Sequence, residues 1–200
     1  MERDNAPRPP DPINTVFHLY DPPLWLVTAA DGPRRGGCIA TFVVRASIVA
    51  ELPRMVIGIA KHHFTWRLIE SAGGFALHLL RITDLDAVWR FGLQSGHQVD
   101  KLAGVPRQST PLGNPIYPDA AAWLDCRVED RLDIGDRTVY LAEVTAAEVL
   151  AQVPVLSVEA LMRNAPPARR AELSRLYRED QAIDTEAILA WRRSHRAGDG

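Results

Sequence analysis

Short apolar runs separated by Gly, Pro and Asp dominate the chain up to about Val149. Residues 24–30 form one such run, and Asp31-Gly32-Pro33 follows it, which predicts a strand ending in a turn. The chain resumes as a second strand over residues 36–47, so the two runs predict a hairpin. Residues 55–60 form a further apolar strand, in which Gly58 indicates a bulge or the close approach of a flat group.

Helical signals alternate with these strands. Residues 65–71 predict a short helix with Thr65 as its N-cap, and Gly73-Gly74 would end it. A strand follows over residues 75–80. Thr83, with Asp86 three residues later, then predicts the capping box of a helix over residues 84–93.

The second half of the chain contains a long loop, a hairpin and a charged tail. Residues 94–120 are polar and rich in Gly and Pro, and a loop of this length is often functional. Residues 121–132 and 138–149 predict two strands joined by a turn at 134–137. The tail predicts two charged helices, one after Pro166-Pro167 and one after Asp184, that pack on the strands or on a second subunit.

These elements predict a mainly β fold, an antiparallel barrel decorated by short helices. We divide the chain into a flexible N-terminal arm (residues 1–13), a barrel domain (14–155) and a C-terminal helical extension (156–200). No GxGxxG or GxxxxGK[ST] motif is present, so the sequence does not indicate a Rossmann or P-loop fold.

Composition narrows the possible partners. The 200 residues carry a formal net charge of −2, so bulk electrostatics do not favour nucleic-acid binding. The longest apolar runs fall well short of a membrane span, and the N-terminus lacks the apolar core of a signal peptide, so we expect a cytoplasmic protein without membrane association. Cys38 and Cys126 occupy apolar strands, which predicts two buried thiols rather than a disulfide or a metal site.

Candidate binding chemistry gathers between Gly36 and Thr65. Small and hydroxylic residues at a strand end, followed by a helix start, suit an anionic, flat ligand, because a helix N-terminus carries about half a positive charge. Arg45 and Lys61 would add charge beside that helix start. Our interpretation is that this segment holds a flavin phosphate and one face of the flavin ring.

Other chemistries have less support. His62-His63 could suggest a metal, but adjacent side chains tend to diverge and no acidic or cysteine residue lies close in sequence, so we predict no metal site. No nucleophilic triad or GxSxG motif is visible, and no catalytic residue is identified.

The order of several segments resembles the flavin reductase family of FMN-binding split-barrel proteins. The similarity runs from Leu24 to about Val149. It includes residues 26–32, the 61–69 segment, residues 74–79, Asp100-Lys101-Leu102-Ala103-Gly104, residues 122–126 and 135–140.

The resemblance implies a homodimer of six-stranded antiparallel Greek-key split barrels that bind FMN, or FAD, and accept a hydride from NADH or NADPH. A partner monooxygenase is a further possibility of this family. The flavin contacts would fall on Ala40, Thr41, Phe42, Arg45, Ala46, Ser47, Lys61, His62, His63 and Thr65. His97, Lys101 and Arg137 are candidates to cover the flavin or meet the nicotinamide.

This chain departs from the family pattern at Ile39 and Phe42, where hydroxyl residues are common, at His63, which replaces a frequent serine, and at Arg137, which replaces a histidine. Two alternatives to an NAD(P)H:flavin oxidoreductase therefore stay open. One is an FMN-binding carrier or electron-transfer protein without nicotinamide turnover. The other is a barrel whose flavin pocket is closed.

Overall fold

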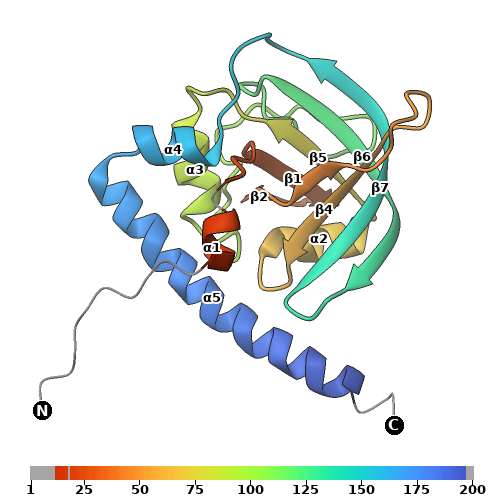
Figure 1. Ribbon diagram of the computed structural model, residues 1–200. Coiled ribbons are helices and arrows are strands. Elements are labelled where there is room, and N and C mark those ends of the chain that lie inside the picture. The colour runs from red at the N-terminus through yellow and green to blue at the C-terminus, as the bar shows by residue number, and fades with distance from the viewer. Residues whose placement is uncertain (1–11, 18, 197–200) are drawn as a thin grey trace, which may run out of the picture.

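Seven antiparallel strands form one sheet in the order β2-β1-β5-β6-β7-β4-β3 (Figure 1). The computed structural model describes residues 12–17 and 19–196. The strands are β1 (Trp25–Asp31), β2 (Arg34–Ala40), β3 (Val43–Arg45), β4 (Arg54–Ala60), β5 (Gly74–Leu79), β6 (Ala122–Asp133) and β7 (Arg137–Val149). The two edge strands, β2 and β3, are joined by only Thr41 and Phe42, so the sheet must curl until its edges meet. The mainly β, split-barrel fold class is therefore confirmed.

The count of seven strands differs from the predicted six because the run over residues 36–47 is divided. Its first part pairs with β1, where Ala40 lies opposite Trp25, whereas Val43 pairs with Ile57 of β4. The backbone changes partner at Phe42, whose carbonyl accepts a hydrogen bond from Gly58 N at 3.0 Å. The run of small and apolar residues continues through this point, so the sequence pattern does not reveal the change of partner.

In the described part of the chain five helices accompany the sheet, namely α1 (Pro12–Phe17), α2 (Phe64–Ala72), α3 (Leu85–Gly92), α4 (Val158–Asn164) and α5 (Pro167–Arg196). The left-handed Gly73 ends α2 as predicted, with φ 67°. The predicted N-cap at Thr65 is wrong, because His63 occupies that position and Thr65 is buried inside the helix. The N-cap of α3 is likewise Asp84 and not Thr83.

Two apolar clusters hold the fold together. The first fills the barrel beneath α2 and includes Val27, Ile57 and Tyr140, all fully buried. The second lies under α3 and α4 and includes Phe91 and Leu156. Cys38 and Cys126 are free and buried, as the sequence predicts, and burial raises the pKa of both thiols.

The long 94–120 segment is attached to the sheet by buried polar contacts. Asp125 of β6 is fully buried, and its carboxylate accepts hydrogen bonds from Leu112 N (2.8 Å) and Asn114 Nδ2 (3.0 Å). Thr28 of β1 donates to Pro115 O at 2.6 Å. Satisfied buried polar groups of this kind fix a segment that has few apolar residues of its own.

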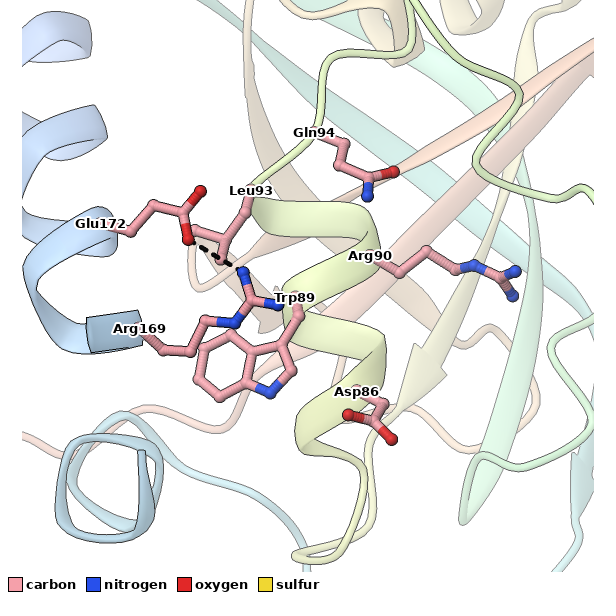
Figure 2. A pocket seen from close by; sticks show the side chains of 7 residues that line it. All are labelled: Asp86, Trp89, Arg90, Leu93, Gln94, Arg169 and Glu172. Carbon is pink, nitrogen blue, oxygen red and sulfur yellow. Dashed lines mark hydrogen bonds and ion pairs between the residues drawn. The ribbon is translucent and has the colours of Figure 1, made fainter. Parts of the chain in front are cut away.

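The C-terminal tail forms one 30-residue helix, α5, instead of the two predicted helices. It runs along the outside of the barrel (Figure 1). Near its start Arg169 stacks over Trp89 of α3, 5.7 Å from the ring centroid, and pairs with Glu172 beside a shallow hollow of about 250 Å³ (Figure 2). Asp184 lies within this helix, and its carboxylate forms an ion pair with Arg137 of β7.

Of the predicted N-terminal arm, residues 1–11 lie outside the described part of the chain, and α1 begins at Pro12. Among the described helices, none is both long enough and apolar enough to cross a bilayer.

Candidate flavin site

Residues 61–65 connect β4 to the start of α2 and form the centre of the candidate site. The loop is fixed through its backbone, because Lys61 N donates to Asp136 O (2.9 Å) and His63 N donates to Ala60 O (3.1 Å). Lys61, His62 and His63 are all half-buried. The helix that follows directs the positive end of its dipole at this loop.

Lys61 is the cation best placed for an anionic ligand. Its ammonium lies 2.6 Å from both carboxylate oxygens of Asp133, at the end of β6. This hydrogen bond is the main reason that the pKa of Asp133 is lowered. An exposed pair of this kind contributes little to stability, so Lys61 can exchange Asp133 for a ligand phosphate at small cost.

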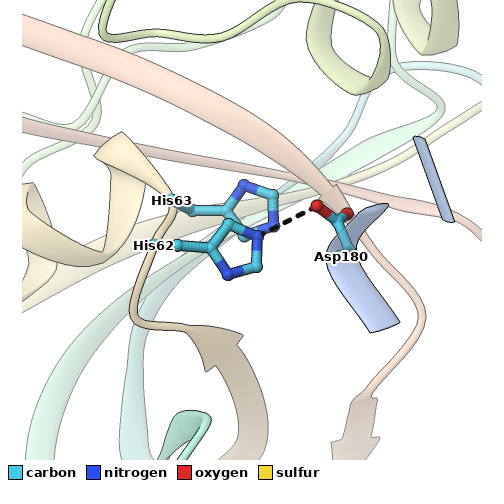
Figure 3. A group of neighbouring side chains, drawn as sticks. All are labelled: His62, His63 and Asp180. Carbon is cyan, nitrogen blue, oxygen red and sulfur yellow. Dashed lines mark ion pairs between the residues drawn. The ribbon is translucent and has the colours of Figure 1, made fainter. Parts of the chain in front are cut away.

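His62 and His63 direct their ring nitrogens at α5 (Figure 3). His62 Nε2 lies 3.3 Å from Asp180 Oδ1, and His62 Nδ1 lies 3.7 Å from Asp184 Oδ1. The rings of His62 and His63 are not divergent, since their centroids are 4.5 Å apart with a tilt of 33°. The argument from adjacent positions is therefore wrong for this loop.

The electrostatic environment keeps His63 uncharged at neutral pH. Burial, and then the neighbouring His62 and other cationic groups, lowers the pKa of His63 to about 4. Arg137, the candidate for the nicotinamide side, is paired with Asp136 and lies 2.8 Å from Asp184. Its guanidinium therefore also faces α5.

Arg45, Ala46 and Ser47 lie at the other end of β4. Arg45 pairs with Met55 and Ala60 with Arg137, and the five residue steps from Met55 to Ala60 span about 16 Å at the usual strand rise. Arg45 is exposed and donates to Ser47 O at 2.5 Å. The expectation that Arg45 adds charge beside the start of α2 is therefore wrong, and its flavin contact stays a prediction.

Ala40, Thr41 and Phe42 lie at the bend between β2 and β3. Ala40 is half-buried, whereas Thr41 and Phe42 are exposed. The ring of Phe42 covers Gly58 so closely that a Cβ at Gly58 would lie 2.2 Å from Phe42 Cδ1. The flat group that Gly58 accommodates is thus the Phe42 ring.

Thr65 and Lys101 face inward, away from the candidate site. Thr65 is 1% exposed, and its hydroxyl acts on the buried Cys38 thiol, whose pKa it lowers while burial raises it. Lys101 is 5% exposed, and its ammonium donates to Phe91 O at 2.8 Å, where it caps α3. Desolvation lowers the pKa of Lys101. The structure therefore contradicts the prediction that Lys101 covers a ligand.

His97 does adjoin the loop. Its ring packs edge-on against Phe64, with centroids 5.3 Å apart, and its Nε2 lies 3.2 Å from His62 O. Beside it is a hollow of about 350 Å³ between the β1–β2 turn, Phe64 and the 96–107 segment, with Arg35 and Arg107 in its wall. This volume falls at the lower end of typical ligand sites.

Sequence reasoning missed the acidic partners Asp133, Asp180 and Asp184. Asp180 and Asp184 lie on a helix far along the chain, and no local pattern links them to the loop. Arg35 follows the predicted turn at residues 31–33, and a basic residue beside a turn is the one local signal that it offers.

Comparisons with known proteins match this architecture. The family model "Flavin reductase like domain" matches residues 17–158. The chain is 30% identical over 139 residues to a high molecular weight rubredoxin of Moorella thermoacetica, covering 68% of this chain and 60% of that protein. It is 26% identical to a ferric-chelate reductase (NAD(P)H) of Archaeoglobus fulgidus, covering 71% of this chain and 84% of the other.

Two further similarities bear on assembly and fold. The reductase subunit HsaB of a flavin-dependent monooxygenase from Mycobacterium tuberculosis is 31% identical, with 58% of this chain and 59% of that protein covered. An FMN-binding protein of Thermus thermophilus superposes with a TM-score of 0.62 at 23% identity, covering 75% of this chain and 80% of the other. The chain thus spans about three fifths of the rubredoxin and HsaB relatives.

Proposed function

Because the chain belongs to the flavin reductase-like domain family, we propose that it is an NAD(P)H-dependent flavin oxidoreductase. The observation that carries the proposal is the loop over residues 61–65, which sets the half-buried Lys61 beside the start of α2. Its neighbour is the basic hollow that His97 borders. Together they offer an anion site next to a space lined by an aromatic ring.

The donor groups of this chain fit a flavin mononucleotide. Lys61 would meet the phosphate as a point charge, and the first turn of α2 adds its dipole. The Phe64 and His97 rings would give apolar contact to a flat ligand. When bound, the flavin supplies the hydride-accepting chemistry, whereas this chain supplies position and electrostatics. We propose that FMN is preferred over FAD, because Lys61 favours a terminal phosphate.

Hydride transfer needs neither an acid nor a base from the protein. The chain's part is to hold the two ring systems in contact and to keep water away. The buried Lys101 ammonium stiffens this region indirectly, since it fixes the last turn of α3 below the 94–120 segment. The backbone at Ala40–Phe42, at the bend between β2 and β3, is the other candidate contact for a flavin ring.

Anaerobic mixing tests the proposed activity. Protein loaded with FMN should lose its visible absorbance on addition of NADH or NADPH much faster than free FMN does. Flavin that stays bound but is not reduced would support the carrier alternative instead. Protein that takes up no flavin would overturn both.

A matched pair of variants tests the anion site. Lys61→Ala should weaken FMN binding by about 1.5–3 kcal/mol, the usual contribution of a charge-assisted contact. Arg67→Ala removes an exposed cation one turn into α2 and should leave the affinity unchanged. Equal affinities for both variants would exclude Lys61 from the site.

The proposed assembly is a homodimer that can serve a partner monooxygenase. Exposed apolar residues at the tip between β3 and β4 support an interface, since Ile48 is 94% and Leu52 66% exposed. The relative HsaB, named as a monooxygenase reductase subunit, supports the partner class. The two reduced, buried thiols fit a cytoplasmic setting. Light scattering on wild-type protein and Ile48→Lys checks the dimer.

A further inference from the structure

We propose that His62, His63 and Asp180 form a binding site for a divalent transition-metal ion, with Zn²⁺ as the reference ion, which joins α5 to the loop after β4. One nitrogen of each imidazole and one carboxylate oxygen lie within 4.8 Å of one another (Figure 3). This inference does not rest on the proposed flavin chemistry, because it concerns side chains that face α5.

The separation of His62 and Asp180 is that of two ligands of one ion. Zn²⁺ binds imidazole nitrogen and carboxylate oxygen at about 2.0–2.2 Å in a tetrahedron, whose edges are then about 3.3–3.5 Å. His62 Nε2 and Asp180 Oδ1 are 3.3 Å apart. Yet Nε2 is buried and makes no hydrogen bond within the described part of the chain. A buried nitrogen without a hydrogen bond, beside a carboxylate at ligand spacing, suits the coordination of a cation.

Asp184 adds a positioning contact. Its Oδ1 is buried without a hydrogen bond among the described residues and lies 3.7 Å from Nδ1, the other ring nitrogen of His62. Metal-bound histidines commonly direct their second nitrogen at a carboxylate, which fixes the ring orientation. A small rotation of His62 on metal binding would close this contact and leave its Nε2 for the ion.

The ligand set selects the class of metal. Two imidazoles and one carboxylate favour Zn²⁺, Co²⁺ or Ni²⁺ over Mg²⁺ and Ca²⁺, which prefer oxygen ligands. Three protein ligands leave one tetrahedral position open. The ion would also neutralise the carboxylates that α5 brings to the loop, and so fasten the helix to the barrel.

The test is a calorimetric titration of the full, chelator-treated and flavin-free chain with ZnCl₂ at pH 7.5. We expect one saturable site per chain, no heat from Mg²⁺, and intense visible bands of tetrahedral Co²⁺ when cobalt replaces zinc. His63→Gln and Asp180→Asn, on separate elements, should each weaken Zn²⁺ binding at least ten-fold. Glu186→Gln, which removes an exposed carboxylate of α5, should bind as wild type does.

Two results would overturn the proposal. One is the lack of saturable Zn²⁺ binding by wild-type protein. The other is wild-type affinity in both His63→Gln and Asp180→Asn, which would place the ion elsewhere. Circular dichroism of each variant establishes that a loss of binding does not reflect unfolding. Since flavin is absent throughout, failure of this proposal leaves the oxidoreductase proposal untouched.

Discussion

Arg137 Nη2 lies 2.8 Å from Asp184 Oδ2, and this ion pair joins β7 to α5 across 47 residues of sequence. It places a carboxylate next to the loop where we propose that a flavin phosphate binds. Burial raises the pKa of Asp184, whereas Arg137 lowers it. The Asp184 carboxylate therefore repels an anionic ligand and pairs with the Arg137 guanidinium of the barrel.

Removing that charge should strengthen flavin binding. Asp184→Asn removes one of the two carboxylates paired with Arg137 and a negative charge near the phosphate, so we expect FMN affinity to rise about five-fold, or ~1 kcal/mol. Fluorescence titration in buffer with a chelator measures it. Riboflavin, which lacks the phosphate, should gain much less, and Glu186→Gln should leave both affinities unchanged. Weaker FMN binding by Asp184→Asn would show that the helix supports the site instead.

The close contact of Phe42 with Gly58 predicts a coupled pair of substitutions. Gly58→Ala forces the Phe42 ring off the β4 backbone, and overpacking of this kind costs about 1–3 kcal/mol. In a Phe42→Ala background the added methyl no longer meets the ring, so its cost should fall sharply. A double-mutant cycle by urea unfolding measures the coupling. Additive effects would mean that the ring does not cover Gly58 in solution.

The fold was more predictable than the site, and the reason is physical. Strands and their turns follow from local alternation and from Gly and Asp at reversals, so the β6–β7 hairpin and the end of α2 at Gly73 could be identified. The division at Phe42 could not, since a change of strand partner leaves no local mark. The single helix α5 was missed because its charged surface resembles two short helices with a break.

The candidate site is formed by side chains that are far apart in the sequence and meet only in the fold. The sequence does not specify which of them come together. Lys61 and His97 were predicted near the ligand, and the structure brings them beside the same loop. Lys101 looked like a loop cation, yet burial turned it inward to Phe91 O. The acidic residues of α5 could be found only from the way the helix crosses the barrel.

Asp125 should control the order of the 94–120 segment. Asp125→Ala leaves the buried Asn114 amide and the part-buried Leu112 N without their acceptor, and a buried donor that loses its partner costs about 1–3 kcal/mol. We expect a loss of about 2–4 kcal/mol in the free energy of unfolding and faster amide exchange over residues 110–116. Asp119→Ala, an exposed position of the same segment, is the control and should change neither quantity. Unchanged exchange in Asp125→Ala would show that the remaining contacts, including those of Thr28 and His78, hold the segment without Asp125.

His78 should make stability depend on pH. This histidine of β5 is fully buried, accepts a hydrogen bond from Tyr117 N at Nε2 (3.1 Å), and contacts Leu26 O through Nδ1 (3.2 Å). Both contacts are satisfied only by the neutral ring with its proton on Nδ1, because a proton on Nε2 would oppose the Tyr117 N–H. Burial lowers the pKa of His78 to about 4.

The sign of the effect follows from the two pKa values. The unfolded chain takes up a proton near pH 6.5 and the folded protein only near pH 4, so the unfolded state binds more protons between these values and stability falls with falling pH. From pH 7.5 to 5.0 this group should remove about 2 kcal/mol. His78→Gln keeps one donor and one acceptor, and its free energy of unfolding should decline about 2 kcal/mol less over that range.

Two other histidines serve as controls for this comparison. His63, which also titrates near pH 4, contributes equally to both proteins. His195→Gln, an exposed change on α5, should follow wild type. Parallel declines in wild type and His78→Gln, measured by urea unfolding, would mean that the folded protein protonates His78 as readily as the unfolded chain does.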